Sequence, residues 1–215
     1  LVAPAEAELK VGQVLGNLRV AGIQGAMEVE DAHGNATLRG GGSATLRRVL
    51  GNLRAGTTAG DLVADDVRGN VWARAIEGCL TLGDVGGNLE AEAVRGGLTA
   101  EHVRGNVSLH PPFSPGSTYT VAGFGNLLLT LPEEASVQLR LRAGGRVDVE
   151  RLGIDLERRD SEAFGTLGAG AATLEASVKG NVTVVSAESR AESTAGSPWE
   201  ELGAQIEWQV HDAMA

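Results

Sequence analysis

A short phrase, Gly followed by Asn and then by an apolar residue, constrains this chain more than any other feature of its sequence. Six of its copies, from Gly16 to Gly105, start at glycines that are 18, 17, 18, 18 and 18 residues apart. Another glycine lies about halfway between successive copies, and none of these intermediate glycines precedes Asn. The unit is therefore a nine-residue repeat whose alternate copies differ. Two units give a period that is typical of one coil of a β-solenoid.

The apolar residues follow this repeat. When each repeat is numbered from its glycine, positions three (Leu18 to Val107) and five (Val20 to Leu109) are apolar throughout, and position eight is mostly apolar. Residues two apart lie on the same side of a strand. We therefore predict parallel coils in which each repeat supplies a short strand, a corner plugged by residue eight, and a turn opened by Gly. A helix does not fit this spacing, and regular glycines would destabilise it.

Composition narrows the possible partners. The chain has 215 residues, of which 42% are apolar but only 3% aromatic, so its core must consist of Ala, Val, Leu and Ile. A formal net charge of −10 argues against nucleic acid or an anionic membrane as the partner. We predict no transmembrane segment, because no apolar run approaches the roughly 18 residues that a span needs. Cys79 is the single cysteine, so an internal disulfide is excluded.

The first residues bear on localisation. The chain shows neither an initiator Met nor a signal peptide. We therefore expect a processed form or an excised domain that lacks the true N-terminus. Its localisation stays open between the bacterial cytoplasm and the cell surface.

Departures from the repeat divide the chain. We predict a lead-in with a first strand over residues 1–15, a solenoid over 16–189, a linker over 190–196 and an amphipathic helix over 197–215. The stretch from Gly125 to Gly180 has the length of about three coils of this period. The charged stretch from Gly153 to Gly170 is expected to be a loop.

The C-terminal helix is predicted from its capping residues and its apolar face. Ser197 serves as the N-cap and Pro198 as the first helical residue. Trp199, Leu202 and Ile206 then share one face at helical spacing. We expect this face to cap the solenoid or to contact a second copy, so a homo-oligomer formed through solenoid ends or through this helix is a hypothesis.

The second half of the chain carries a resemblance. The residues Tyr119-Thr120-Val121, the run from Gly125 to Glu133, Ser136 to Leu139, and the closing run from Leu167 to Val184 resemble the family of bacterial β-solenoid proteins named for a predicted role as adhesins. The resemblance implies a single-stranded right-handed parallel β-helix and adhesion to surfaces, and it brings no catalytic residues. The bactofilins, which are polymer-forming β-helices, are a looser match.

The asparagines of the repeat are expected to stack at one corner. We interpret them as a structural turn ladder, because Asn tolerates the left-handed conformation and stacked amides can bond along the column. A ligand groove is the alternative. The residues of this column are Asn17, Asn35, Asn52, Asn70, Asn88 and Asn106. A calcium-binding roll would require a regular Asp column, which the sequence lacks, so we predict no metal site and no cofactor.

Outward positions supply the candidate interaction surface. Trp72 stands at position four and points outward, as do Val63, Thr45, Thr81 and Thr99 on the alternate face. An exposed Trp often marks a contact. Together with Trp199, Leu202 and Ile206 of the predicted helix, Trp72, Thr81 and Thr99 are the candidate contacts with a protein or glycan surface.

The sequence favours a non-catalytic structural or interaction module for adhesion or self-assembly. One alternative is a carbohydrate-active β-helix enzyme, because Asp65 and Asp66 lie together with Glu101 and His102 two coils later. We predict no catalytic residues, since acidic pairs on a corner are usually only solvated. A bactofilin-like polymer-forming scaffold is the other alternative.

Overall fold

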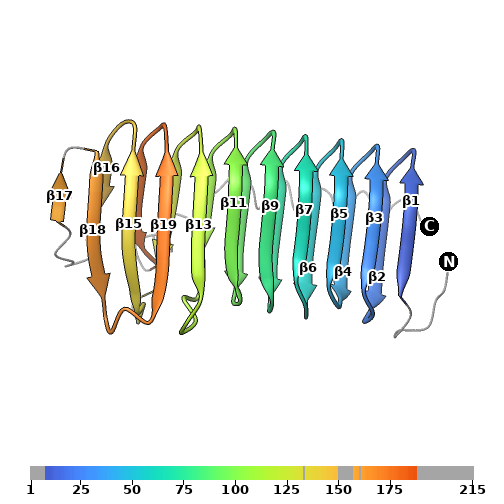
Figure 1. Ribbon diagram of the computed structural model, residues 1–215, viewed down its shortest axis with the longest axis horizontal. Helices are drawn as coiled ribbons and strands as arrows, with labels where there is room; N and C mark the ends of the chain where they lie inside the picture. Colours follow the sequence, from blue (N-terminus) through green and yellow to red (C-terminus); the bar gives the residue numbers. More distant parts are fainter. Residues whose placement is uncertain (1–7, 133, 150–156, 160, 188–215) are drawn as a thin grey trace, which may run out of the picture.

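A computed structural model describes residues 8–132, 134–149, 157–159 and 161–187. These residues form an all-β solenoid in which the chain coils between two facing sheets (Figure 1). Sheet A has eleven strands and sheet B has nine. The strands of sheet A are β1 (Leu9–Val14), β3 (Met27–Ala32), β5 (Ala44–Val49), β7 (Leu62–Val67), β9 (Cys79–Val85), β11 (Gly97–Val103), β13 (Thr118–Gly123), β19 (Ala172–Val178), β15 (Val137–Ala143), β18 (Glu162–Leu167) and β17 (Glu157–Arg159). Those of sheet B are β16 (Val147–Val149), β20 (Val182–Ser186), β14 (Leu127–Leu131), β12 (Val107–His110), β10 (Leu89–Val94), β8 (Val71–Ile76), β6 (Leu53–Thr58), β4 (Ala36–Gly41) and β2 (Leu18–Ile23).

From β1 to β14 the strands alternate between the two sheets in chain order. Each strand pairs in parallel with the strand one coil away, so Leu62 aligns with Leu80 and Leu80 with Leu98. Corner residues of successive coils, such as Asn70 and Asn88, are 18 residues apart and bonded to each other. The predicted parallel solenoid with a coil of two repeats is confirmed.

The core lies between the sheets and consists of the predicted positions. In β7 the side chains of Leu62, Ala64 and Val67 are at most 1% exposed, while the residues between them face outward. Burial of these small aliphatic side chains drives the coil to close, because each strand alone would leave one apolar face in water. Val20 and Ile23 of β2 are only half-buried, since β2 lies at the edge of sheet B.

Two aromatic residues fill the core where the strict repeat ends. The Tyr119 hydroxyl donates a hydrogen bond to the Val94 carbonyl at 2.9 Å. The ring of Phe113 meets Tyr119 edge-on at 5.3 Å between centroids. Burial raises the pKa of Tyr119 above its ordinary value. Phe113 and Pro111 are buried at this corner, whereas Pro112 at position eight is exposed.

The coils after β14 do not stack in chain order. Strand β19 pairs with β13 on one side and with β15 on the other, and β20 likewise separates β14 from β16. The Gly180 N–H therefore donates to the Gly125 carbonyl at 3.1 Å. The sequence-based expectation of about three coils between these glycines is wrong. Strands β15 and β16 do not pair with β13 and β14, because β19 and β20, which come later in the chain, lie between them. The number of residues between two glycines gives the length of the chain between them. It cannot show that a later strand is inserted between two earlier ones.

Sheet A ends in an antiparallel pair. Strand β18 runs antiparallel to β15, and β17 antiparallel to β18 (Figure 1). The stretch from Gly153 to Gly170, expected to be a loop, thus contains strand residues. Residues 1–7 of the lead-in, the linker over 190–196 and the helix over 197–215 lie outside the described residues.

The inserted coil can be tested by cysteine cross-linking in a chain with Cys79→Ser. Thr120→Cys with Glu175→Cys should form a disulfide under mild oxidation, because these residues are direct partners on β13 and β19. Thr120→Cys with Arg140→Cys should not, because β19 separates their strands by about 10 Å. Mass spectrometry of the cross-linked peptides decides, and efficient formation of only the second disulfide would contradict the inserted coil.

Candidate interaction surface

The asparagines form a continuous hydrogen-bonded column at one corner. Each Asn Oδ1 accepts a hydrogen bond from the backbone N–H of the Asn one coil further on, for example Asn88 N–H to Asn70 Oδ1 at 2.8 Å. The same bond links every successive pair from Asn17 to Asn106 and continues to Asn126 and Asn181. The Oδ1 atom of each Asn in this column accepts a hydrogen bond from the backbone of the neighbouring coil. Its role is therefore structural.

The glycine before each Asn is required by the same contact. A Cβ at Gly69 would lie 2.5 Å from Asn52 Oδ1 and 2.6 Å from the Gly51 carbonyl oxygen, well inside van der Waals contact. Equivalent clashes with the preceding Asn and glycine occur down the column, at Gly34, Gly51, Gly87, Gly105 and Gly180. The recurring Gly-Asn pair is thus explained by close stacking of coils.

The opposite corner uses a shorter and chemically mixed ladder. Ser43 Oγ accepts from the Asp61 N–H at 3.2 Å, and Asp61 Oδ1 accepts from the Cys79 N–H at 2.7 Å. The Cys79 thiol is exposed and contacts the Gly96 carbonyl at 3.4 Å. These residues occupy the place that Asn holds at the first corner, which explains why the alternate repeats differ.

Position seven of the Asn repeats has a left-handed backbone. Gly22 and Gly40 occupy this position in the first two copies, with φ of 74° and 63°. Thr57, Ala75 and Ala93 occupy it in the next three, with φ of 53–56°. Such a conformation costs a residue with a side chain roughly 1–2 kcal/mol. Sequence analysis did not identify this column, although the two glycines were a usable signal.

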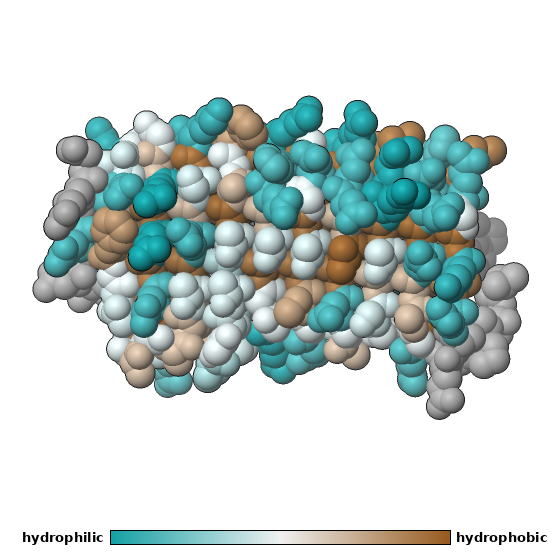
Figure 2. Space-filling view, viewed as in Figure 1, coloured by the Kyte–Doolittle hydropathy of each residue, from teal (hydrophilic) through white to brown (hydrophobic). Residues whose placement is uncertain are grey.

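A row of small β-branched residues crosses the outer face of sheet A. Thr45, Val63, Thr81, Thr99 and Thr120 align as direct partners on five neighbouring strands. Figure 2 looks onto this sheet and shows a band of mostly white residues across its middle, with the hydrophilic residues gathered mainly above it in this view. Two of the predicted contact residues, Thr81 and Thr99, thus share one flat face.

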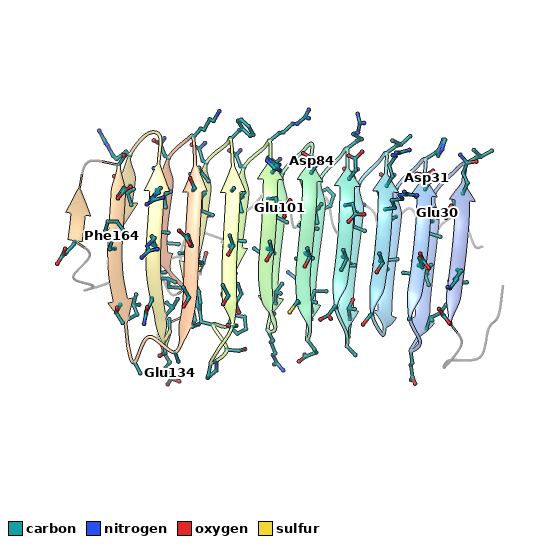
Figure 3. All side chains as sticks on the ribbon, viewed as in Figure 1. Glu30, Asp31, Asp84, Glu101, Glu134 and Phe164 are labelled. Carbon is teal, nitrogen blue, oxygen red and sulfur yellow. The ribbon has the colours of Figure 1, made fainter. Side chains whose placement is uncertain are left out.

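The acidic residues considered for catalysis lie near one end of the sheet A strands. Asp66 lies 3.2 Å from Arg68 and 3.9 Å from Arg48, so its charge is balanced by two guanidinium groups. Asp65 is exposed beside it. Glu101 and His102 lie two strands away on β11, about 10 Å along the sheet. The labelled acids of Figure 3 are likewise spread along the sheet.

Trp72 lies on the other sheet and has a cation beside it. The ring is half-buried on the outer face of β8, and the Arg54 guanidinium carbon lies 4.4 Å from the ring centroid. Arg54 is its direct partner on β6. A cation–π contact of this kind holds the indole in a defined orientation. Trp72 is therefore on a different face from Thr81 and Thr99. The remaining predicted contacts, Trp199, Leu202 and Ile206, lie outside the described residues.

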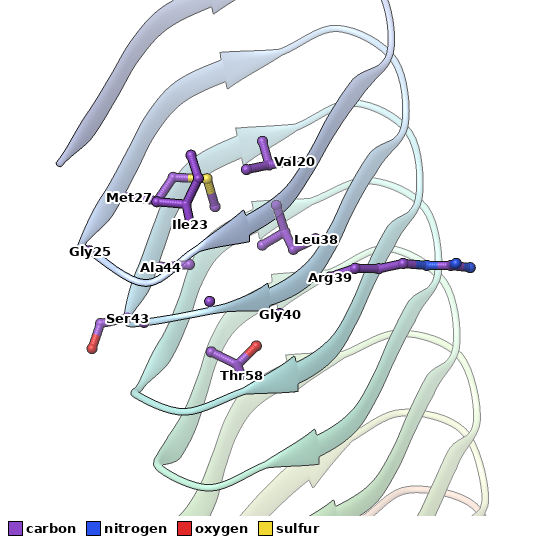
Figure 4. Close-up of a pocket in the computed structure, with 12 residues that line it drawn as sticks. Val20, Ile23, Gly25, Met27, Leu38, Arg39, Gly40, Ser43, Ala44 and Thr58 are labelled. Carbon is purple, nitrogen blue, oxygen red and sulfur yellow. The ribbon is translucent and has the colours of Figure 1, made fainter. Parts of the chain in front are cut away.

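Two hollows in the described residues are candidates for small-molecule sites. The first, a cavity of about 20 Å³ inside the first coils, has room for about one water molecule (Figure 4). The second is an open depression of about 470 Å³ on the outer face of sheet A. Its lining includes Arg140 and Glu175, which pair with each other at 3.8 Å, and Phe164. Neither hollow combines enclosure with converging polar groups, as ligand pockets usually do.

The described residues show no gathering of three or more His, Cys, Asp or Glu side chains suited to a metal ion. In the same part of the chain, no helix has the length and apolar character needed to cross a bilayer. Searches with family models, curated proteins and solved structures found no match to this chain. The resemblance to the adhesin and bactofilin families therefore stays a prediction.

The corner contact makes a sharp prediction about two glycines. Gly69→Ala should destabilise the protein by about 1–3 kcal/mol, because the new methyl group would push the backbone of the preceding coil. Gly56→Ala is the matched control. Nothing lies within 4 Å of a Cβ there, so this change should be neutral or stabilise by up to about 1 kcal/mol. Urea unfolding compares them, and equal stabilities would contradict the proposed packing.

Proposed function

We propose that this chain is a non-catalytic interaction module, a rigid right-handed β-solenoid that presents flat outer faces for adhesion to a protein or glycan surface. Parallel crossovers almost always take the right-handed sense. The observation that supports the proposal best is the fixed register of the outward side chains. Residues such as Thr81 and Thr99 are direct partners on strands whose inner faces are fully packed.

An array of this kind suits a partner that is itself extended. Adjacent strands repeat at about 4.8 Å, so a column offers the same contact many times along one line. Each contact with a small side chain is weak, but several contacts made together give useful avidity. The rigid backbone reduces the entropy that would be lost on binding.

Self-assembly is a second candidate function, and the unlike ends of the solenoid favour it. At one end, β1 and β2 are the edge strands of the two sheets among the described residues, and Leu15 beside them is 78% exposed. At the other end, sheet A finishes with the antiparallel strands β18 and β17. Contact between two first coils would be self-complementary and would give a closed dimer.

A binding screen on glycan and protein arrays, run beside size-exclusion light scattering, tests the module. We expect saturable binding of at least one partner that leaves it chemically unchanged by mass spectrometry. The double variant Thr81→Lys, Thr99→Lys changes only the outward row of sheet A, and we expect it to have a stability similar to that of the unchanged protein. Conversion of the partner to a product would instead indicate an enzyme. A monomer that binds no partner would reject both adhesion and self-assembly.

A further inference from the structure

One end of sheet B lacks acidic residues although the protein is acidic overall, and the first acids of this sheet, Glu90 and Glu92, lie on β10 beside β8. The first four strands of sheet B, β2, β4, β6 and β8, contain four arginines and one tryptophan but no Asp or Glu. By contrast, β3, β7 and β9 of sheet A each contain acidic residues. Because the whole chain carries a net charge of −10, a basic face of this kind is a local exception. We call it the Arg–Trp strip: Arg19, Arg39, Arg54, Trp72 and Arg74.

The register places the strip in two staggered rows. In one row Arg19, Thr37, Arg54 and Trp72 follow one another as direct partners. In the other row the order is Ala21, Arg39, Gly56 and Arg74. Arginines therefore alternate with small residues, and arginines of the same row are two strands, or about 10 Å, apart. This arrangement gives a shallow floor with evenly spaced cationic groups above it.

Most of these cations are available to a ligand. Arg74 is paired with Glu92 at 2.6 Å, whereas the ion pairs among the described residues do not include Arg19, Arg39 or Arg54. All three side chains are exposed. Figure 4 shows Arg39 extending away from the coils while its neighbour Leu38 points inward. Arg54 also contacts Trp72, which orients both groups.

We propose that the Arg–Trp strip binds an acidic polysaccharide whose sugar rings carry carboxylates, a polyuronate. This inference rests on the proposed interaction module and names the class of its ligand. A guanidinium group matches a carboxylate with two parallel hydrogen bonds. The flat indole of Trp72 supplies an apolar platform of the kind on which a sugar ring stacks. The spacing within a row is comparable to the length of a disaccharide unit.

The other polyanions fit less well. Single-stranded nucleic acid is usually held by successive aromatic side chains, and the strip has only Trp72. A protein partner would favour an apolar centre with aromatic anchors, whereas the floor here consists of Ala21, Thr37 and Gly56. The wide spacing of the arginines suits one carboxylate per sugar better than the denser charge of a heavily sulfated polymer.

Biolayer interferometry on the full chain tests this inference, with immobilised polygalacturonate as the probe and neutral dextran, sulfated dextran and oligo-dT as comparators. We expect binding to polygalacturonate that weakens with salt. The triple variant Arg19→Gln, Arg39→Gln, Arg54→Gln should lose about tenfold in affinity, the loss expected for three exposed charge contacts. Trp72→Ala should reduce binding at high salt as well, because stacking is not screened.

A matched control has the same change in charge elsewhere. Arg47→Gln, Arg104→Gln, Arg146→Gln removes three exposed arginines away from the strip and should keep affinity within about twofold. Equal melting temperatures of both triple variants confirm that each is folded.

Equal affinities of the two triple variants for polygalacturonate would overturn the proposal, as would tighter binding of dextran, sulfated dextran or oligo-dT. If only the strip variant fell in molecular mass by light scattering, the strip would be a contact with a second copy of this chain, and the polyuronate proposal would be overturned. If polygalacturonate does not bind, the proposed ligand of the strip is overturned but the proposed interaction module is not. The screen on glycan and protein arrays tests that module separately, through the outer face of sheet A.

Discussion

The structure depends on the close contact at one corner, where the backbone of one coil meets the Asn side chain and glycine carbonyl of the coil before it. That contact leaves no space for a Cβ, so Gly must recur, and it offers a side-chain oxygen to a backbone N–H, so Asn follows. Both requirements repeat once per coil. They fix the register of every strand between the corners, since a shift by one residue would move the whole apolar set outward.

A fixed register has a direct consequence for the surface. Side chains one coil apart are forced into straight columns, so charge and shape are set column by column. Sheet A carries a row of Thr and Val flanked by ion pairs such as Arg48 with Asp31 at 3.3 Å. Sheet B instead carries arginines beside Trp72 on its first strands. The same core therefore supports two chemically different faces, and the proposed functions follow from this difference.

Much of the fold was predictable because the signal repeats. The Gly-Asn phrase and the apolar positions around Leu80 and Leu98 each recur often enough to define strand, corner and inward face. The inserted coil was not predictable, because β19 and β20 use the same pattern as any other coil and nothing local tells which neighbours they join. Burial of Phe113 accompanies its edge-on contact with Tyr119, which lies on the next strand and is not part of the nine-residue pattern.

The candidate surface was only partly predictable, for similar reasons. The outward position of Trp72 follows from the repeat, and its neighbour Arg54 stands one full coil earlier in the chain, so this contact could have been inferred from the period. The run of four sheet B strands without an acidic residue emerges only when alternate repeats are assigned to separate sheets. The left-handed Thr57 was unpredictable from its own identity, because β-branched residues rarely adopt this conformation.

The most direct test of the account is amide hydrogen exchange, followed by NMR, at the asparagines of the corner column. These residues lie in turns at the surface, half-buried or exposed, where backbone amides normally exchange fast. The account predicts slow exchange at Asn35, Asn52, Asn70, Asn88 and Asn106, comparable to that of strand amides, because each N–H is bonded to the Oδ1 of the preceding coil. Fast exchange at these positions, with slow exchange kept in the strands, would contradict the corner contact as the organising constraint.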